Sequence, residues 1–334
     1  MSRIALLTGG STPERDIALT GATQVAPALR ALGHAVTVVD TVAGPLDAAG
    51  EGALFAAAGI RREPPTAADL AGLRRREDLP RLVGEPALAG ADLVFLLLHG
   101  DQGEGGSVQA LLDLAGLRYT GSDALGSGLA MDKEVAKRLL AQAGLPQAPW
   151  VRWPGTAAAL AALGLPLIVK PSRAGSSVGV TIVREPERLP EAIEVARAVD
   201  REILVEAFLP GREFSVGVLG ERALGVGEIV PEHEFFDYEC KYTAGMSQEI
   251  FPAPIAPPLA DQMRALALAT HRALKLRDVS RVDFKLDAAG RPCVLEANTL
   301  PGMTGGSLLP QSAAVMGLDF QTLCAEICRL AFER

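Results

Sequence analysis

Short apolar runs alternate with helical patterns in the first third of the chain, and this alternation constrains the fold more than any other feature. The runs lie at 4–8, 35–40 and 93–99, each close to turn residues, while residues 16–32 repeat apolar side chains at helical spacing. Strands that alternate with helices are typical of a parallel sheet with helices on its faces. The sequence therefore predicts an N-terminal open α/β domain over residues 1–120.

Two further domains are expected after this one. Strand-like runs at 167–170, 180–183 and 202–206 predict a small α+β domain over residues 121–210. A second set of strand-like runs and a final helix from Phe320 predict a C-terminal α+β domain over residues 211–334; those runs are 213–219, 223–229, 282–286 and 293–296. Residues 42–90, rich in Ala, Gly, Pro and Arg, are expected to form an irregular insertion or surface helices.

Composition excludes several classes of protein. The 334 residues carry a formal net charge of -8, which leaves no overall cationic field for a nucleic-acid partner. Apolar runs such as 93–98 are far too short to cross a bilayer, and the first residues lack the apolar segment of a signal peptide, so a cytoplasmic location is expected. Buried free thiols are expected for the unpaired cysteines, which are Cys240, Cys293, Cys324 and Cys328.

Two strand-like segments near the C-terminus carry three oxygen ligands. Asp283 lies on the first segment, and Glu296 and Asn298 lie on the second, beyond a turn at 287–291. Side chains alternate along a strand, so on adjacent antiparallel strands these three can point to one face. Such a set suits Mg²⁺, which takes its remaining ligands from nucleotide phosphates. The alternative for the carboxylates alone is a solvated acidic hairpin.

A Gly/Ser loop at 170–179 is a candidate phosphate site. Its glycines permit close backbone approach, and its N–H groups with the Ser176 and Ser177 hydroxyls can bind phosphate oxygens. The chain contains neither a Walker A motif nor GxGxxG. Gly175-x-Ser177-x-Gly179 formally matches a serine-hydrolase elbow, but an elbow needs a strand, a turn and a helix. Here a β-branched strand follows, which makes the loop the tip of a hairpin.

Other candidate residues lie at the ends of predicted elements. Lys133 opens a helix, and Lys170 ends a strand directly before the Gly/Ser loop. Alone, either lysine is more often a solvent-exposed charge. Glu14 follows the first strand and His99 ends the strand at 93–98, where an open α/β sheet presents its ligand contacts. Two strands thus point at one crevice.

In order along the chain, seven motifs resemble the D-alanine:D-alanine ligase family of the ATP-grasp superfamily. The resemblance covers nearly the whole chain, and it implies a three-domain ATP-grasp architecture. The motifs are Gly-Gly-Ser-Thr-Pro-Glu-Arg at 9–15, Leu-His-Gly at 98–100, Met-Asp-Lys at 131–133, the loop 170–179, Asp-Tyr-Glu-Cys-Lys-Tyr at 237–242, Arg-Val-Asp at 281–283 and Glu-Ala-Asn-Thr-Leu-Pro-Gly-Met-Thr at 296–304.

The resemblance implies an ATP site between the central and C-terminal domains. Two Mg²⁺ ions, for which Mn²⁺ is expected to substitute, would be held by Asp283, Glu296 and Asn298. Two lysines would contact the phosphates, and Lys241 would lie on a loop that closes over them. The full set of implied ATP-binding residues is Lys133, Lys170, Ser176, Ser177, Glu206, Ala207, Phe208, Leu209, Glu213 and Lys241.

For the amino acids, the resemblance implies two adjacent sites. The first D-alanine would bind through Glu14 and His99, and its carboxylate would attack the γ-phosphorus to give an acylphosphate. The amine of the second D-alanine, whose carboxylate is held by Ser307, would attack the acyl carbon. Arg281 would contact the substrate and, with the Gly302 N–H, stabilise the oxyanion. The implied catalytic residues are Glu14, Ser176, Tyr242, Arg281 and Gly302.

D-Alanyl-D-alanine for peptidoglycan precursors is the implied product. A ligase with D-lactate or D-serine as second substrate is the closest alternative, and Tyr242 favours an amine nucleophile over lactate. A non-catalytic nucleotide sensor would require loss of a metal-binding or oxyanion residue, and all of them are present. The resemblance also implies a homodimer formed through the N-terminal domain.

Overall fold

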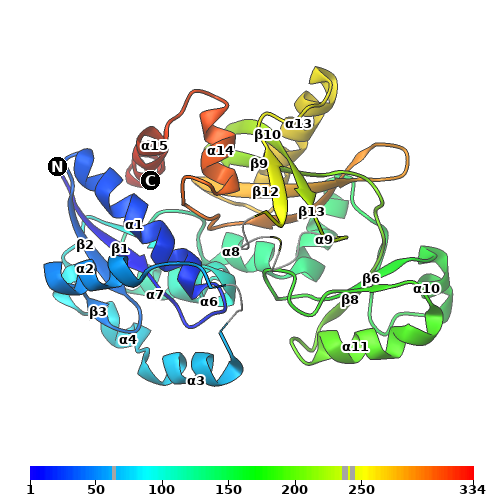
Figure 1. Cartoon of the computed structure of the whole chain (residues 1–334), viewed down its shortest axis with the longest axis horizontal. Helices are drawn as coiled ribbons and strands as arrows, with labels where there is room; N and C mark the ends of the chain where they lie inside the picture. Colours follow the sequence, from blue (N-terminus) through cyan, green and yellow to red (C-terminus); the bar gives the residue numbers. More distant parts are fainter. Residues whose placement is uncertain (62–64, 235–239, 241–244) are drawn as a thin grey trace.

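The computed structural model describes residues 1–61, 65–234, 240 and 245–334. Within these ranges the chain forms three β-sheets, and helices pack against each of them (Figure 1). No helix of the described part has the length and apolar character needed to span a membrane. The predicted α/β class and the chain order of the three sheets are confirmed.

The first sheet has the strand order β3-β2-β1-β4. β1 (Arg3–Thr8) pairs in parallel with β2 (Ala35–Asp40) on one side and with β4 (Leu93–Leu97) on the other. The chain therefore changes direction across the sheet at β1. At such a switch point, the segments that follow neighbouring strands meet in one crevice.

Helices cover this sheet and continue into the centre of the chain. The sequence predicts either an irregular insertion or surface helices at 42–90, and the described residues of this segment form mostly helices. The elements of this part are α1 (Arg15–Ala31), β3 (Gly44–Pro45), α2 (Ala48–Ala57), α3 (Ala67–Arg76), α4 (Leu79–Leu82), α5 (Pro86–Ala89), α6 (Gly100–Glu104), α7 (Ser107–Leu114), α8 (Ala124–Met131) and α9 (Lys133–Gln142).

The central sheet has the strand order β5-β8-β6-β7 and is antiparallel. β6 (Leu167–Pro171) and β7 (Thr181–Val183) form a hairpin, so the Gly/Ser loop is a hairpin tip and not a nucleophile elbow. The other elements of this part are β5 (Trp150–Arg152), α10 (Ala157–Leu163), a 3₁₀ turn (Pro186–Arg188), α11 (Leu189–Arg197) and β8 (Ile203–Ala207).

The third sheet is antiparallel, in the order β11-β10-β9-β12-β13. Helices α13 (Pro257–Ala273) and α14 (Leu308–Ala314) follow its outer strands, and α15 (Phe320–Phe332) ends the chain. The strands are β9 (Glu213–Leu219), β10 (Arg222–Pro231), β11 (Ser247–Ile250), β12 (Val279–Leu286) and β13 (Pro292–Asn298).

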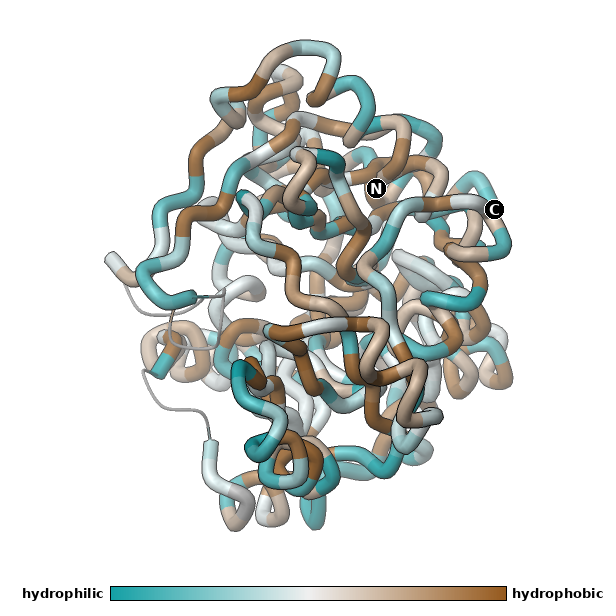
Figure 2. The backbone as a smooth tube through the Cα atoms, turned by 90° about the vertical axis from the view of Figure 1, so that its right-hand side faces the viewer, coloured by the Kyte–Doolittle hydropathy of each residue, from teal (hydrophilic) through white to brown (hydrophobic). Residues whose placement is uncertain are grey.

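The largest apolar core joins the two ends of the chain. Leu323, Ile327 and Ala331 of α15 pack in one cluster with residues of β1 and α1, and α15 lies beside α1 in Figure 1. Hydrophobic and hydrophilic stretches alternate at short intervals along the backbone (Figure 2). All four cysteines are free and buried, as the sequence predicts. The domain boundaries at residues 120 and 210 stay predictions.

Candidate active site

Glu14 lies in the crevice at the carboxyl edge of the first sheet. It directly precedes α1, and its Oε1 accepts a hydrogen bond of 2.5 Å from Ser176 Oγ at the tip of the β6–β7 hairpin. The first sheet and the Gly/Ser loop therefore meet at this carboxylate. Gly100 lies against it with φ +70°, and a Cβ there would come within 2.8 Å of Glu14 Oε2. The site thus requires glycine at this position.

His99 follows β4 and is buried beside Glu14. Its Nδ1 lies 2.9 Å from the Leu300 carbonyl oxygen, which can only accept, so Nδ1 carries the proton when the ring is neutral. Burial lowers the pKa of His99, although the charge of Glu14 opposes this. His99 lines the cavity that contains Glu14. The neutral ring leaves Nε2 as an acceptor, and this buried atom has no hydrogen-bond partner among the described residues. A substrate ammonium group can donate to it.

Glu104 also lines this cavity, although it is absent from the predicted site. Its Oε1 accepts from the N–H groups of Thr299 and Leu300, each at 3.1 Å, and its Oε2 accepts from Gly100 N–H at 3.2 Å. The carboxylate therefore ties the first sheet to the segment after β13. The sequence feature that could have identified Glu104 is its position, one helical turn after His99-Gly100.

Glu104 is expected to make the stability of the protein depend on pH. Burial, reinforced by the charge of Glu14, raises the pKa of Glu104 to about 7. A carboxyl group with a raised pKa binds a proton on folding, so its contribution is complete below the unfolded pKa and is lost as pH rises through about 7. We expect the free energy of unfolding in urea to fall by on the order of 2 kcal/mol from this group between pH 4.5 and 7.5.

Glu104→Gln is expected to flatten this pH dependence, because the amide does not titrate. Urea titrations of both proteins at several pH values measure it. Equal slopes of unfolding free energy against pH in the two proteins would contradict the assignment to Glu104.

Four polar side chains share one face of the β12–β13 pair. Asp283 lies opposite Glu296, and Arg281 lies opposite Asn298 in the strand register. Arg281 donates to both carboxylate oxygens of Asp283, with Nε–Oδ1 at 3.0 Å and Nη2–Oδ2 at 2.9 Å. Burial alone would lower the pKa of Arg281, but the charge of Asp283 outweighs this effect and raises it. Arg281 therefore stays a cation. The predicted shared face is present.

The chemistry of this face fits Mg²⁺. Its carboxylates are Asp283 and Glu296, and Asn298 donates its amide nitrogen to Asp283 Oδ2 at 3.0 Å, which turns its oxygen away from that carboxylate. Two carboxylates and an amide oxygen are suitable when phosphates complete the shell. In this structure Arg281 neutralises Asp283, and Lys133 Nζ lies 3.3 Å from Glu296. A bound ion would compete with these two cations.

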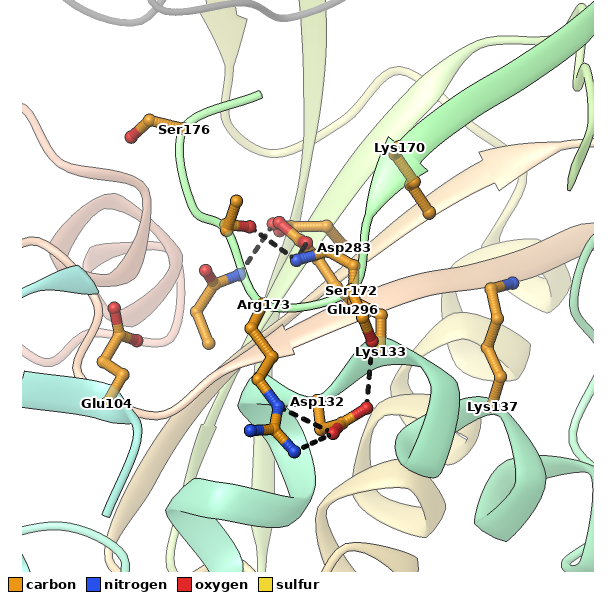
Figure 3. Close-up of polar contacts among 12 residues, drawn as sticks. Glu104, Asp132, Lys133, Lys137, Lys170, Ser172, Arg173, Ser176, Asp283 and Glu296 are labelled. Carbon is orange, nitrogen blue, oxygen red and sulfur yellow. Dashed lines mark hydrogen bonds and ion pairs between the residues drawn. The ribbon is translucent and has the colours of Figure 1, made fainter. Parts of the chain in front are cut away.

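The start of α9 clamps the base of the Gly/Ser loop. Asp132 caps the helix and accepts from Ser172 Oγ at 2.9 Å and from the Arg173 guanidinium at 2.6 Å (Figure 3). Lys133, the first residue of the helix, donates from Nζ to the Ala174 carbonyl at 2.7 Å. Backbone strain is concentrated at the tip, where Ser176 has φ 50°. The loop is therefore fixed at its base and strained at its tip.

A second cavity lies between the central and third sheets. Glu206 lies on its wall with its carboxylate buried, and Lys170 Nζ is 2.7 Å from Glu206 Oε1. Burial opposes ionisation of Glu206, but the charges of two lysines outweigh it and hold its pKa below the usual range. The predicted ATP-binding residues that line this cavity are Lys133, Lys170, Ser177, Glu206, Ala207, Phe208, Leu209 and Glu213.

The cavity around Glu14 shares a wall with this second cavity. Lys133, Ala174 and Glu296 line both of them. A Cβ at Gly302 would lie 2.9 Å from Ser307 Oγ, so the absence of a side chain allows these two residues to approach. The predicted residues that line the first cavity are Glu14, His99, Lys133, Ser176, Arg281, Glu296, Asn298, Gly302 and Ser307.

Asp283 lines the second cavity, whereas its hydrogen-bond partner Arg281 lines the first. Lys241 and Tyr242 lie outside the described residues, so their predicted roles are not tested. Every predicted residue within the described part lines one of the two cavities.

Three sheets with a hairpin loop over a cationic and acidic crevice define an ATP-grasp fold. The N-terminal part, residues 3–122, matches the family described as D-ala D-ala ligase N-terminus, and residues 139–329 match D-ala D-ala ligase C-terminus. The chain belongs to the D-alanine–D-alanine ligase family.

Individual relatives agree with this assignment. The D-alanine–D-alanine ligase of Geobacter sulfurreducens is 40% identical over 330 residues, covering 98% of this chain and 93% of that one. The Bacillus anthracis D-alanine–D-alanine ligase complexed with ATP has TM-score 0.77 and 28% identity, with 99% and 97% coverage. The VanG D-Ala:D-Ser ligase of Enterococcus faecalis has TM-score 0.79 and 28% identity, with 99% of both chains covered.

Proposed function

We propose that this chain is an ATP-dependent ligase that joins two D-alanine molecules into D-alanyl-D-alanine for peptidoglycan precursor synthesis. The observation that carries the proposal is the shared wall of the two cavities, formed by Lys133, Ala174 and Glu296. A nucleotide in one cavity can present its terminal phosphate to a carboxylate in the other. Family membership supplies the identity of the amino acids.

The nucleotide would lie in the cavity lined by Lys170 and Glu206, with the Gly/Ser loop over its phosphates. Lys133 and Lys170 supply positive charge, and Ser177 and backbone N–H groups supply donors. Asp283, Glu296 and Asn298 would hold Mg²⁺, which neutralises phosphate charge when bound. Adenine and ribose would contact the segment 206–209 and Glu213.

The first D-alanine would place its ammonium group between Glu14 and the acceptor Nε2 of His99. Its carboxylate oxygen attacks the γ-phosphorus, the bond to ADP breaks, and an acylphosphate forms. The amine of the second D-alanine, oriented by Ser307, attacks the acyl carbon and phosphate leaves. Arg281 and the Gly302 N–H would stabilise the oxyanion, because fixed donors act strongly in a water-poor site. Ser176 and Tyr242 would hold Glu14 in place.

D-Alanine is favoured as the second substrate over D-serine or D-lactate. This preference rests on the curated relatives at about 40% identity, which are D-alanine–D-alanine ligases. Solved D-Ala:D-Ser and D-alanine–D-alanine ligases are equally similar to this chain, at 28% identity. A homodimer and a cytoplasmic location belong to the same proposal, the latter because ATP is supplied there.

Phosphate release from ATP and Mg²⁺ tests the function directly. The reactions contain D-alanine, L-alanine, D-alanine with D-serine, or D-alanine with D-lactate, and the products are identified by mass. We expect turnover with D-alanine and a D-alanyl-D-alanine product. Phosphate release that does not depend on D-alanine would refute the proposed substrate, and a mixed dipeptide as main product would favour the D-serine alternative.

A further inference from the structure

Glu206 is paired with two lysines that have different surroundings. Lys170 Nζ lies 2.7 Å from Glu206 Oε1, and Lys137 Nζ lies 3.2 Å from Glu206 Oε2. The side chains of Lys137 and Glu206 are only 3% and 4% exposed. Two cations on one carboxylate leave a net positive charge in the wall of the nucleotide cavity.

The two lysines differ in their access to that cavity. Lys170 and Glu206 line it, whereas Lys137 lies behind the wall on α9 and does not. Figure 3 shows Lys170 on a strand and Lys137 on the neighbouring helix. Lys170 can therefore reach a bound phosphate by leaving Glu206, and Lys137 is enclosed by the protein.

We propose that Lys137 is a positioning residue that holds the charge of Glu206, so that Lys170 can move from Glu206 to the phosphates of ATP. A buried carboxylate that loses its last cation is strongly disfavoured. With Lys137 present, departure of Lys170 leaves Glu206 paired. Without Lys137, Lys170 is the remaining described cation on this carboxylate and stays there.

This inference rests on the proposed ATP site and assigns a role to a residue that lines neither of the two cavities. Repulsion between the two lysine charges also favours movement of Lys170 away from Glu206. Burial lowers the pKa of Lys137, the charge of Glu206 opposes that effect, and the nearby charge of Lys170 lowers the pKa further. Release of Lys170 to a phosphate relieves that repulsion.

Lys137→Met tests the role, since methionine keeps the length of the side chain and removes its charge. We expect the Kd of a non-hydrolysable ATP analogue with Mg²⁺ to rise at least tenfold, while the Kd of adenosine stays within about twofold, because adenosine lacks phosphates for Lys170. The KM for ATP should rise with it, while kcat at saturating ATP changes less. If Lys137→Met raised the Kd of adenosine as much as that of the ATP analogue, the variant would have damaged the pocket in general. That result would overturn the proposal.

The double variant Lys137→Met/Glu206→Gln provides the decisive comparison. Because Glu206 itself lines the nucleotide cavity, this double variant is compared with Glu206→Gln alone. The neutral amide at position 206 no longer retains Lys170, so loss of Lys137 should weaken binding of the ATP analogue much less in this background than in the wild type. Arg138→Met is the matched control, because it removes one charge from the exposed side of α9, where Arg138 pairs with Glu134. It should leave both Kd values unchanged.

Several results would overturn the inference. Unchanged binding of the ATP analogue by Lys137→Met would do so, as would an equal loss of binding from Lys137→Met in the wild-type and Glu206→Gln backgrounds. Circular dichroism and the Tm of each variant confirm that the comparison concerns folded protein. If the wild-type chain itself fails to bind the ATP analogue, the proposed function fails, whereas wild-type binding with an unaffected Lys137→Met variant defeats the inference alone.

Discussion

Arg281→Ala is expected to lower kcat by about a hundredfold or more, the scale for loss of one oxyanion donor. The guanidinium lies mostly buried at the wall of the proposed amino-acid cavity, and its hydrogen bonds to both Asp283 carboxylate oxygens fix its orientation before the reaction. The KM for ATP should change little. Initial rates of phosphate release at saturating D-alanine measure the effect.

Arg281→Lys is the matched control for this prediction. Lysine keeps the positive charge beside Asp283 but lacks the planar pair of donors, so kcat should fall less than in the alanine variant. Because Asp283 also belongs to the proposed metal site, the dependence of rate on Mg²⁺ concentration separates the two roles. A kcat equal to that of the wild type in Arg281→Ala would remove this residue from the chemical step.

Glu14→Gln is expected to raise the KM for the first D-alanine by roughly tenfold to a hundredfold. The change keeps an oxygen that can accept from Ser176 but removes the charge that would face the substrate ammonium group. Hydrogen bonds to charged groups contribute about 1.5–3 kcal/mol, and every 1.4 kcal/mol is about tenfold in affinity. Initial-rate analysis of the two D-alanine sites gives the measurement.

Ser176→Ala provides the comparison for this charge effect. It removes the 2.5 Å hydrogen bond to Glu14 and leaves the carboxylate charge in place, so the KM for the first D-alanine should rise less. An unaltered KM in Glu14→Gln would contradict the assignment of Glu14 to the ammonium group.

Much of the site was predictable because its residues lie at places that local patterns define. Glu14 and His99 each follow a strand of the parallel sheet, and Asp283 and Glu296 lie on a predicted hairpin. Period-two alternation along those strands was sufficient to place them on one face. The pairing of β12 with β13 in the structure confirms that reasoning.

Other features could not be derived from local pattern, because they depend on contacts between distant segments. The Glu206 carboxylate receives Lys137 from α9 and Lys170 from β6, and no periodicity in the sequence brings these residues together. Glu104 reaches the backbone of Thr299 across most of the chain. The structure, rather than the sequence pattern, reveals such long-range contacts.

The position of α15 has a consequence for synthesis of the protein. Leu323, Ile327 and Ala331 belong to the same apolar cluster as Ile4 and Leu6 of β1. A nascent chain cannot complete the core of its first sheet until α15 has left the ribosome. Truncation before Phe320 would expose the apolar surface of an N-terminal domain that is already fully translated, and we expect such a fragment to aggregate.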